Sequence, residues 1–228
     1  MKPILETIKE KITKGERLTK EDGLALYDSY DIARIAMLAD FARVSRLESV
    51  GEGHKKDHVY WINNHHLNLT NICEGTCKFC AYRRKEEQDG AFAYTLDAAI
   101  EYIETKVSQN AREIHIVSAI NPAYTLDYYK ELFRACRRAI PNAHIQALTA
   151  VEIDYIAKIS GISVEETLKE LISAGLGSIP GGGAEIFDEN VRKQVCPEKI
   201  SGKRWLEVTE TAHKLGLKSN VTMLTGIG

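Results

Sequence analysis

The stretch Cys73-Glu74-Gly75-Thr76-Cys77-Lys78-Phe79-Cys80 holds three of the chain's five cysteines, in a C-x3-C-x2-C spacing. A structural zinc site normally takes four protein ligands, and an electron-transfer [4Fe–4S] cluster takes four cysteine thiolates. Three thiolates therefore indicate a [4Fe–4S] cluster in which one iron keeps an open position for a small molecule. The stretch is a candidate catalytic centre, with Cys73, Cys77 and Cys80 as the metal ligands.

The composition narrows the class of protein. The chain has 228 residues, of which 44% are hydrophobic, and a net charge of -2, which suits one sizeable α/β core. No basic run predicts nucleic acid as a partner, and neither a signal peptide nor a membrane-spanning apolar run is evident. An odd number of cysteines, three of them clustered, favours metal binding in a reducing compartment over disulfides. We therefore expect a cytoplasmic protein with no nucleic-acid or membrane partner.

Predicted strands and helices alternate on the C-terminal side of a helical segment. Residues 1–55 have helical periodicity and predict an N-terminal helical cap, whereas residues 56–228 alternate between strand and helix. The five predicted strands are Val59–Leu69, Glu113–Ser118, Ala143–Thr149, Leu176–Ile179 and Ser219–Leu224. The helices between them begin at the N-capping residues Thr95, Thr125, Ser163 and Ser201. This pattern predicts an α/β fold, a partial (β/α) TIM-like barrel of about five parallel strands.

Unusual stretches follow four of the predicted strands. The cysteines follow the first strand, Ser118–Pro122 follows the second, Thr149–Glu152 the third and Gly181–Gly183 the fourth. The chemistry of α/β barrels lies at the carboxyl ends of the strands. We therefore expect these four stretches to converge on one rim and to form the site.

Five stretches besides the cysteines carry a likeness to one group of enzymes. They are Asn68-Leu69-Thr70-Asn71-Ile72-Cys73, Ile114-His115-Ile116-Val117, Thr149-Ala150-Val151-Glu152-Ile153, Pro180-Gly181-Gly182-Gly183-Ala184-Glu185-Ile186-Phe187 and Ser219-Asn220-Val221-Thr222-Met223-Leu224. With them the chain resembles the radical S-adenosylmethionine (SAM) superfamily from about Arg17 onward. Within that superfamily it is similar to aminofutalosine synthase of the futalosine route to menaquinone.

This resemblance implies cofactors, a substrate and site residues. The cofactors are a [4Fe–4S] cluster and SAM, which serves as co-substrate. The reaction is addition of the 5′-deoxyadenosyl radical to 3-[(1-carboxyvinyl)oxy]benzoate, a small molecule, with a one-electron donor such as flavodoxin or ferredoxin. In such enzymes the residue at Phe79 lies near the adenine, and the loop at Ser118 binds the SAM amino group. The implied cofactor-binding residues are Phe79, Ser118, Ala119, Thr149, Glu152 and Gly182.

The implied substrate carries two carboxylates, which need cationic or N–H donors. Arg83, Arg84 and the backbone amides of Gly181 to Gly183 are the candidates, and the sequence does not choose among them. Glu152 and Glu185 each have two interpretations, contact with a ribose hydroxyl or capping of a helix.

The chain departs from the family pattern in four respects, and one of them is Leu69 where a Tyr is usual. Ser118-Ala119-Ile120-Asn121-Pro122 stands where Gly-Gly-Leu-His-Pro is usual. The sequence also stops at Gly228, where the family continues through further strands, so we expect a barrel truncated at its C-terminus.

Three alternatives stay open. The reaction could be that of the related cyclic dehypoxanthine futalosine cyclase, although Thr149-Ala150-Val151-Glu152-Ile153 favours the synthase. The chain could be a truncated, non-catalytic metal-binding protein. The three cysteines could instead bind zinc, with His65 or His66 as the fourth ligand.

Overall fold

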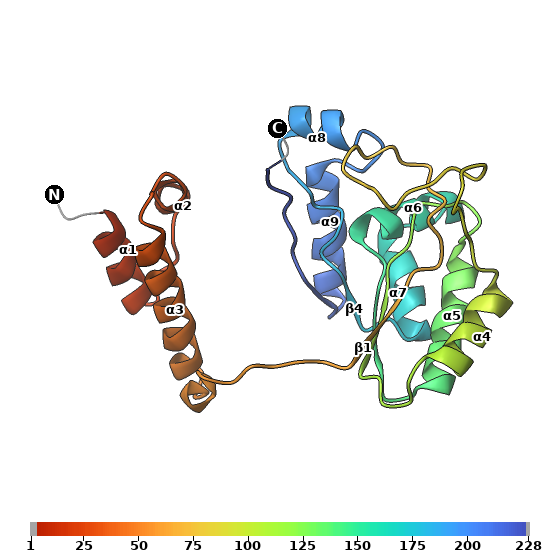
Figure 1. Cartoon of the computed structure of the whole chain (residues 1–228), viewed down its shortest axis with the longest axis horizontal. Helices are drawn as coiled ribbons and strands as arrows, with labels where there is room; N and C mark the ends of the chain where they lie inside the picture. The colour runs from red at the N-terminus through yellow and green to blue at the C-terminus, as the bar shows by residue number, and fades with distance from the viewer. Residues whose placement is uncertain (1–3, 227–228) are drawn as a thin grey trace. The chain divides into compact units, whose positions relative to one another are not determined.

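The computed structural model describes residues 4–226, and the chain divides into two compact units (Figure 1). The first unit ends at Trp61 and the second begins at Ile62. The domain boundary expected from the sequence, between residues 55 and 56, stays a prediction.

The first unit is a group of short helices, α1 (Ile4–Thr13), α2 (Lys20–Tyr27), α3 (Ile32–Ser49) and the 3-10 turn η1 (Gly53–Lys55). Thr19 caps α2 in a capping box, because its hydroxyl accepts from the Asp22 amide while the Asp22 carboxylate accepts from the Thr19 amide. Leu5, Ile8 and Leu38 form its small apolar core.

The second unit is built on one sheet of five parallel strands in the order β1-β2-β3-β4-β5. The strands are β1 (Asn64–Leu67), β2 (Glu113–Ile116), β3 (His144–Ala147), β4 (Ser178–Ile179) and β5 (Lys218–Ser219). The helices are α4 (Leu96–Lys106), α5 (Leu126–Ala139), α6 (Ala150–Ser160), α7 (Val164–Ala174), α8 (Glu189–Val195) and α9 (Gly202–Lys214). A sequential order of parallel strands with right-handed crossovers places the connecting helices on one face of the sheet. The predicted fold class, a partial (β/α) barrel of about five parallel strands, is confirmed.

The main core lies between the sheet and its helices. Ile114 pairs with Ile145 across β2 and β3, and Ile116 pairs with Ala147; all four side chains are buried. Leu132 of α5 belongs to the same apolar core, together with the aromatic residues Tyr129 and Phe133 of that helix. The predicted N-caps Thr95, Thr125, Ser163 and Ser201 each accept a hydrogen bond from an amide in the first turn of the helix that follows. Capping and core packing thus fix where each strand ends and each helix begins.

Three local expectations were wrong. The first strand is shorter than predicted, because Val59 is 92% exposed and pairing begins only at Asn64, which lies opposite Glu113. The last strand ends at Ser219, and Val221 beyond it is 67% exposed instead of paired. Helix α8 had not been expected at all. Apolar residues alone predict neither the start of strand pairing nor a seven-residue helix.

Candidate functional site

A cavity of about 300 Å³ lies at the carboxyl ends of the strands. Its walls come from the loops that follow β1, β2, β3 and β4, together with Lys199 from the segment after α8. All nine residues that the sequence marked as ligands or cofactor contacts line it, namely Cys73, Cys77, Phe79, Cys80, Ser118, Ala119, Thr149, Glu152 and Gly182. The convergence that the strand order predicted is therefore present, while the role of each residue stays a prediction.

The cysteine loop is held by backbone contacts to distant segments. The Cys73 amide donates to the Arg84 carbonyl at 3.1 Å, and the Glu74 amide donates to the Ile120 carbonyl at 2.9 Å. The Lys78 amide donates to the Val195 carbonyl, also at 2.9 Å, at the end of α8. The loop is thus fixed from the β2 side and from the α8 side.

Carboxylate and ammonium groups add two further anchors to this loop. The Glu198 carboxylate accepts from the Thr76 amide at 2.9 Å and from the Thr76 hydroxyl. The Lys85 ammonium donates to the Cys73 carbonyl at 2.9 Å. Charged groups make stronger hydrogen bonds than neutral ones, so these contacts restrict the loop more than the backbone pairs do.

The donor set suits an iron–sulfur cluster with three protein thiolates. Cys73, Cys77 and Cys80 are free thiols that line one cavity. A Cβ atom at Gly75 would stand 3.5 Å from the Cys73 Sγ and 4.0 Å from the Cys77 Sγ, so the missing side chain leaves room beside both sulfurs. Burial raises the pKa of the Cys77 thiol, a cost that a bound metal offsets by taking the thiolate.

The zinc alternative finds less support in this geometry. His65 and His66 lie on β1, and neither lines the cavity that the three cysteines share. Among residues 4–226 no three or more His, Cys, Asp or Glu side chains are arranged so that they could together hold one metal ion. In a [4Fe–4S] cluster each thiolate binds a different iron, so the three sulfurs need not converge on one point.

Glu152 joins the cavity wall to the start of α6. Its carboxylate accepts from the amide and hydroxyl of Thr149, both at 2.7 Å, and from the Ser118 amide at 3.1 Å. The helix-capping interpretation of Glu152 is therefore present, and the side chain also lines the cavity. Burial raises its pKa, while the hydrogen bonds from Thr149 and Ser118 act in the opposite direction. Oε2 already accepts both hydrogen bonds from Thr149, whereas Oε1 accepts only from Ser118 and keeps lone-pair capacity for a ligand hydroxyl.

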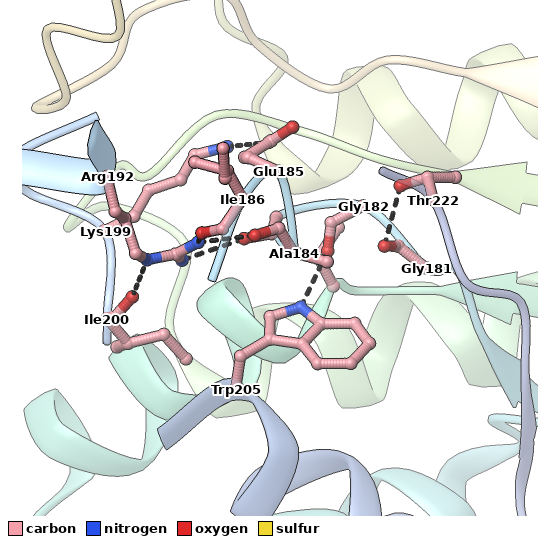
Figure 2. Close-up of polar contacts among 12 residues, drawn as sticks. Gly181, Gly182, Ala184, Glu185, Ile186, Arg192, Lys199, Ile200, Trp205 and Thr222 are labelled. Carbon is pink, nitrogen blue, oxygen red and sulfur yellow. Dashed lines mark hydrogen bonds and ion pairs between the residues drawn. The ribbon is translucent and has the colours of Figure 1, made fainter. Parts of the chain in front are cut away.

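The glycine turn after β4 packs closely against its own chain. A Cβ at Gly181 would lie 2.5 Å from the Asn220 carbonyl carbon, and one at Gly183 would lie 2.5 Å from the Val151 Cγ2. Gly183 also has φ of +83°, a left-handed conformation that side chains disfavour. Figure 2 shows the carbonyls of this turn engaged by protein donors, with Trp205 Nε1 donating to the Gly182 carbonyl at 3.1 Å. Close packing alone thus accounts for glycine at positions 181 and 183, and Gly182 and Gly183 also border the cavity.

Arg192 fixes the segment that follows the glycines, a role that no sequence pattern predicted. Arg192 is 2% exposed. Its guanidinium donates to the carbonyls of Ala184, Ile186 and Ile200 (Figure 2) and to the carbonyl of Gly183. This segment carries Glu185, whose φ of +52° is one of two positive values outside glycine among the described residues. Glu185 forms an ion pair with Lys199, whose ammonium lies 5.4 Å from the centre of the Phe79 ring. Lys199 lies in a loop without periodicity, so only the structure places it in the site.

Arg84, a candidate for binding a substrate carboxylate, does not line the cavity, and neither do Asn121 and Cys196. Arg84 donates to the backbone carbonyls of Ala81, Arg83 and Asp89, which gives it a structural role. Asn121 donates to the Ile72 carbonyl at 3.3 Å. Cys196 is buried beneath the cysteine loop in an apolar cluster with Cys77 and Val195.

The sequence pattern of the radical SAM superfamily matches residues 67–228. The chain belongs to the radical SAM superfamily. The cofactors of this superfamily are a [4Fe–4S] cluster and SAM, and the predicted cofactors of the chain agree with them.

Curated relatives include two kinds of enzyme. The aminodeoxyfutalosine synthase of Thermus thermophilus is 38% identical over 224 residues, covering 98% of this chain and 58% of that protein. A 5-amino-6-(D-ribitylamino)uracil–L-tyrosine 4-hydroxyphenyl transferase of Microcystis aeruginosa is 36% identical, covering 95% of this chain and 57% of that protein. The chain therefore spans less than two thirds of these relatives, and it resembles the synthase family that its motifs indicated.

Solved structures support the fold. The FeFe-hydrogenase maturase HydG from Carboxydothermus hydrogenoformans has a TM-score of 0.68 at 19% identity, covering 98% of this chain and 49% of that one. Methylornithine synthase PylB also has a TM-score of 0.68, at 16% identity, covering 96% of this chain and 59% of that one. Within the described residues no helix is both long and apolar enough to cross a membrane.

Proposed function

We propose that this chain provides the cluster and SAM site of an enzyme of the aminofutalosine synthase type. The observation that carries the proposal is the single cavity shared by the cysteine loop, the Ser118 loop, the start of α6 and the glycine turn. The identity to aminodeoxyfutalosine synthase over almost the whole chain supports the choice of reaction.

When bound, the cluster and SAM would supply the 5′-deoxyadenosyl radical, whose addition to 3-[(1-carboxyvinyl)oxy]benzoate gives aminofutalosine with loss of a carboxylate as CO2 or bicarbonate. Cys73, Cys77 and Cys80 would hold the cluster. The buried face of the loop, where Cys77 packs on Val195 and Cys196, keeps water from that side of the site.

The remaining wall residues would bind and orient SAM. An ammonium group donates hydrogen bonds, so the carbonyl oxygens of Ser118 and Ala119 and the Ser118 hydroxyl are groups in that loop that could accept from the methionine amine. Glu152 Oε1 has a lone pair left for a ribose hydroxyl, and Phe79 would offer an aromatic face to the adenine. We further propose a cytoplasmic location and a flavodoxin- or ferredoxin-type electron donor, consistent with the reducing chemistry.

The first test is an EPR spectrum of the anaerobically reconstituted and reduced protein, with and without SAM. We expect a [4Fe–4S]+ signal that changes when SAM is added, and 5′-deoxyadenosine formation that disappears in Cys77→Ala. A signal that is indifferent to SAM, or equal 5′-deoxyadenosine from the variant, would contradict the proposal.

A second candidate activity is that of the tyrosine 4-hydroxyphenyl transferases, because their identity to this chain is nearly as high. The two are separated by incubation with adenosine-labelled SAM. In the proposed reaction the label enters the product made from 3-[(1-carboxyvinyl)oxy]benzoate. Consumption of tyrosine with 5-amino-6-(D-ribitylamino)uracil would favour the transferase instead. The same label also excludes the cyclase, whose product contains no adenosine from SAM.

A further inference from the structure

The side chains of Arg83 and Arg84 are used differently, although the residues are neighbours. Arg84 is fixed by two backbone pairs, since its amide donates to the Asn71 carbonyl at 2.7 Å and its carbonyl accepts from Cys73. Its guanidinium donates to three backbone carbonyls around the loop. Arg84 is therefore committed to the protein itself.

Arg83 lies in the cavity wall beside Cys80 and Tyr82. Its Nε atom is buried, and within residues 4–226 it has no hydrogen-bond partner. A buried guanidinium N–H without an acceptor loses hydration and gains nothing in return, which is unfavourable. A ligand atom that accepts a hydrogen bond from Arg83 Nε would remove this unfavourable contribution.

The acidic side chains of the cavity do not meet this need. Glu152 accepts from Thr149 and Ser118, and Glu185 is paired with Lys199. Of the two cations that line the described cavity, Lys199 therefore has a carboxylate partner and Arg83 has none. A ligand in the cavity could supply the acceptor that these side chains do not provide.

We propose that Arg83 binds a carboxylate of a ligand held beside the cysteine loop. A guanidinium presents parallel N–H groups that match the two oxygens of a carboxylate, which a lysine ammonium does not. This inference rests on the proposed function, which offers two sources of that group, the methionine carboxylate of SAM and a carboxylate of the second substrate.

The experiment compares Arg83→Gln and Arg83→Lys with the unchanged protein. The matched control is Arg134→Gln, which removes an exposed arginine paired with Glu131 on α5. Iron and sulfide content are measured first, so that only protein with a full cluster is compared. The dissociation constants of SAM and of decarboxylated SAM are then measured by anaerobic equilibrium dialysis. The KM for 3-[(1-carboxyvinyl)oxy]benzoate is then measured at a saturating concentration of SAM.

If the group belongs to SAM, Arg83→Gln weakens SAM binding roughly tenfold to a hundredfold, as loss of a charged hydrogen-bond pair does. Decarboxylated SAM is then bound equally by the variant and the unchanged protein. If the group belongs to the second substrate, SAM binding is unchanged and the KM rises by a similar factor. In both cases Arg83→Lys recovers only part of the loss.

Effects of Arg83→Gln within twofold of Arg134→Gln on both ligands would overturn the proposal while leaving the proposed function intact. A failure of Arg83→Gln to assemble a cluster, together with unaltered binding in a fully loaded Arg83→Lys, would assign Arg83 to loop structure and also overturn it. An unchanged protein that holds a full cluster but binds no SAM would instead overturn the proposed function, and this inference with it.

Discussion

The Glu198 carboxylate accepts two hydrogen bonds from Thr76, one from its amide at 2.9 Å and one from its hydroxyl. Thr76 lies between Cys73 and Cys77, and Glu198 is 122 residues further along the chain. One carboxylate thus joins the cysteine loop to the segment after α8, beside Lys199 and the apolar cluster around Cys196.

We expect Glu198→Gln to weaken the hold on the cluster without unfolding the protein. The amide of glutamine can accept only at its oxygen and carries no charge, so about 1 kcal/mol of loop stabilisation is lost. Release of iron to a chelator should therefore be about fivefold faster. The control is Glu210→Gln, which removes an exposed partner of Lys214 on α9. Equal release rates in the two variants would contradict the anchoring role.

The same contact predicts a pH dependence. The hydrogen bonds from Thr76 lower the pKa of Glu198 below its ordinary 4.5. A lowered folded-state pKa means that the contact stabilises the loop above the unfolded pKa and is lost as the pH falls through the folded value. In the cluster-free protein, the Thr76 amide resonance should titrate with a midpoint below 4.5. A midpoint at or above 4.5, or the same titration in Glu198→Gln, would show that another group is being observed.

Alkylation of the cluster-free protein should reach Cys77 later than Cys73. Cys77 is 8% exposed, and burial raises its thiol pKa, whereas Cys73 is half-buried. Because the thiolate is the reactive form, the rate at Cys77 should keep rising up to a pH above 9.0, the ordinary pKa of a cysteine thiol. Peptide mass spectrometry after timed iodoacetamide treatment measures both rates. Equal rates would mean that the loop opens fully when the cluster is absent.

Substitution of Gly183 separates close packing from backbone strain. Gly183→Ala places a Cβ 2.5 Å from Val151 at a φ of +83°, so strain and overpacking add. Gly161→Ala is the control, because Gly161 has φ of +68° and nothing within 4 Å of the added atom. We expect a loss in free energy of unfolding of about 1 kcal/mol for Gly161→Ala and about 2–4 kcal/mol for Gly183→Ala. Urea titrations followed by circular dichroism measure both. A similar loss in the two variants would mean that the Val151 side chain moves away from the added Cβ without a loss of stability.

The elements with local signals could be predicted from the sequence. Thr95, Thr125, Ser163 and Ser201 cap helices as expected, because a capping hydroxyl and the amides it binds lie within one turn. The cysteine spacing and the order of strands were also enough to bring the predicted site residues to one cavity. These features depend on neighbours in the sequence or on the general geometry of parallel sheets.

Features that depend on distant partners could not be predicted. Arg192 is buried because four carbonyls from two other segments surround its guanidinium, and nothing near it in the sequence indicates this. The difference between Arg83 and Arg84 likewise depends on which carbonyls lie within reach. Val221 was expected in a strand that continues to Leu224, yet β5 ends before it. The spacing of apolar residues predicts whether a segment is a helix or a strand, but it does not predict which distant segment will pack against it or accept its hydrogen bonds.

The contact between the Lys78 amide and the Val195 carbonyl has a consequence for how the protein matures. The thiols leave the ribosome long before α8 has been synthesised, and until then the cysteine loop lacks the surface on which Cys77 packs. Cluster insertion should therefore follow synthesis of the segment through Glu198. Nascent chains that end earlier would present three unshielded thiols to the cell.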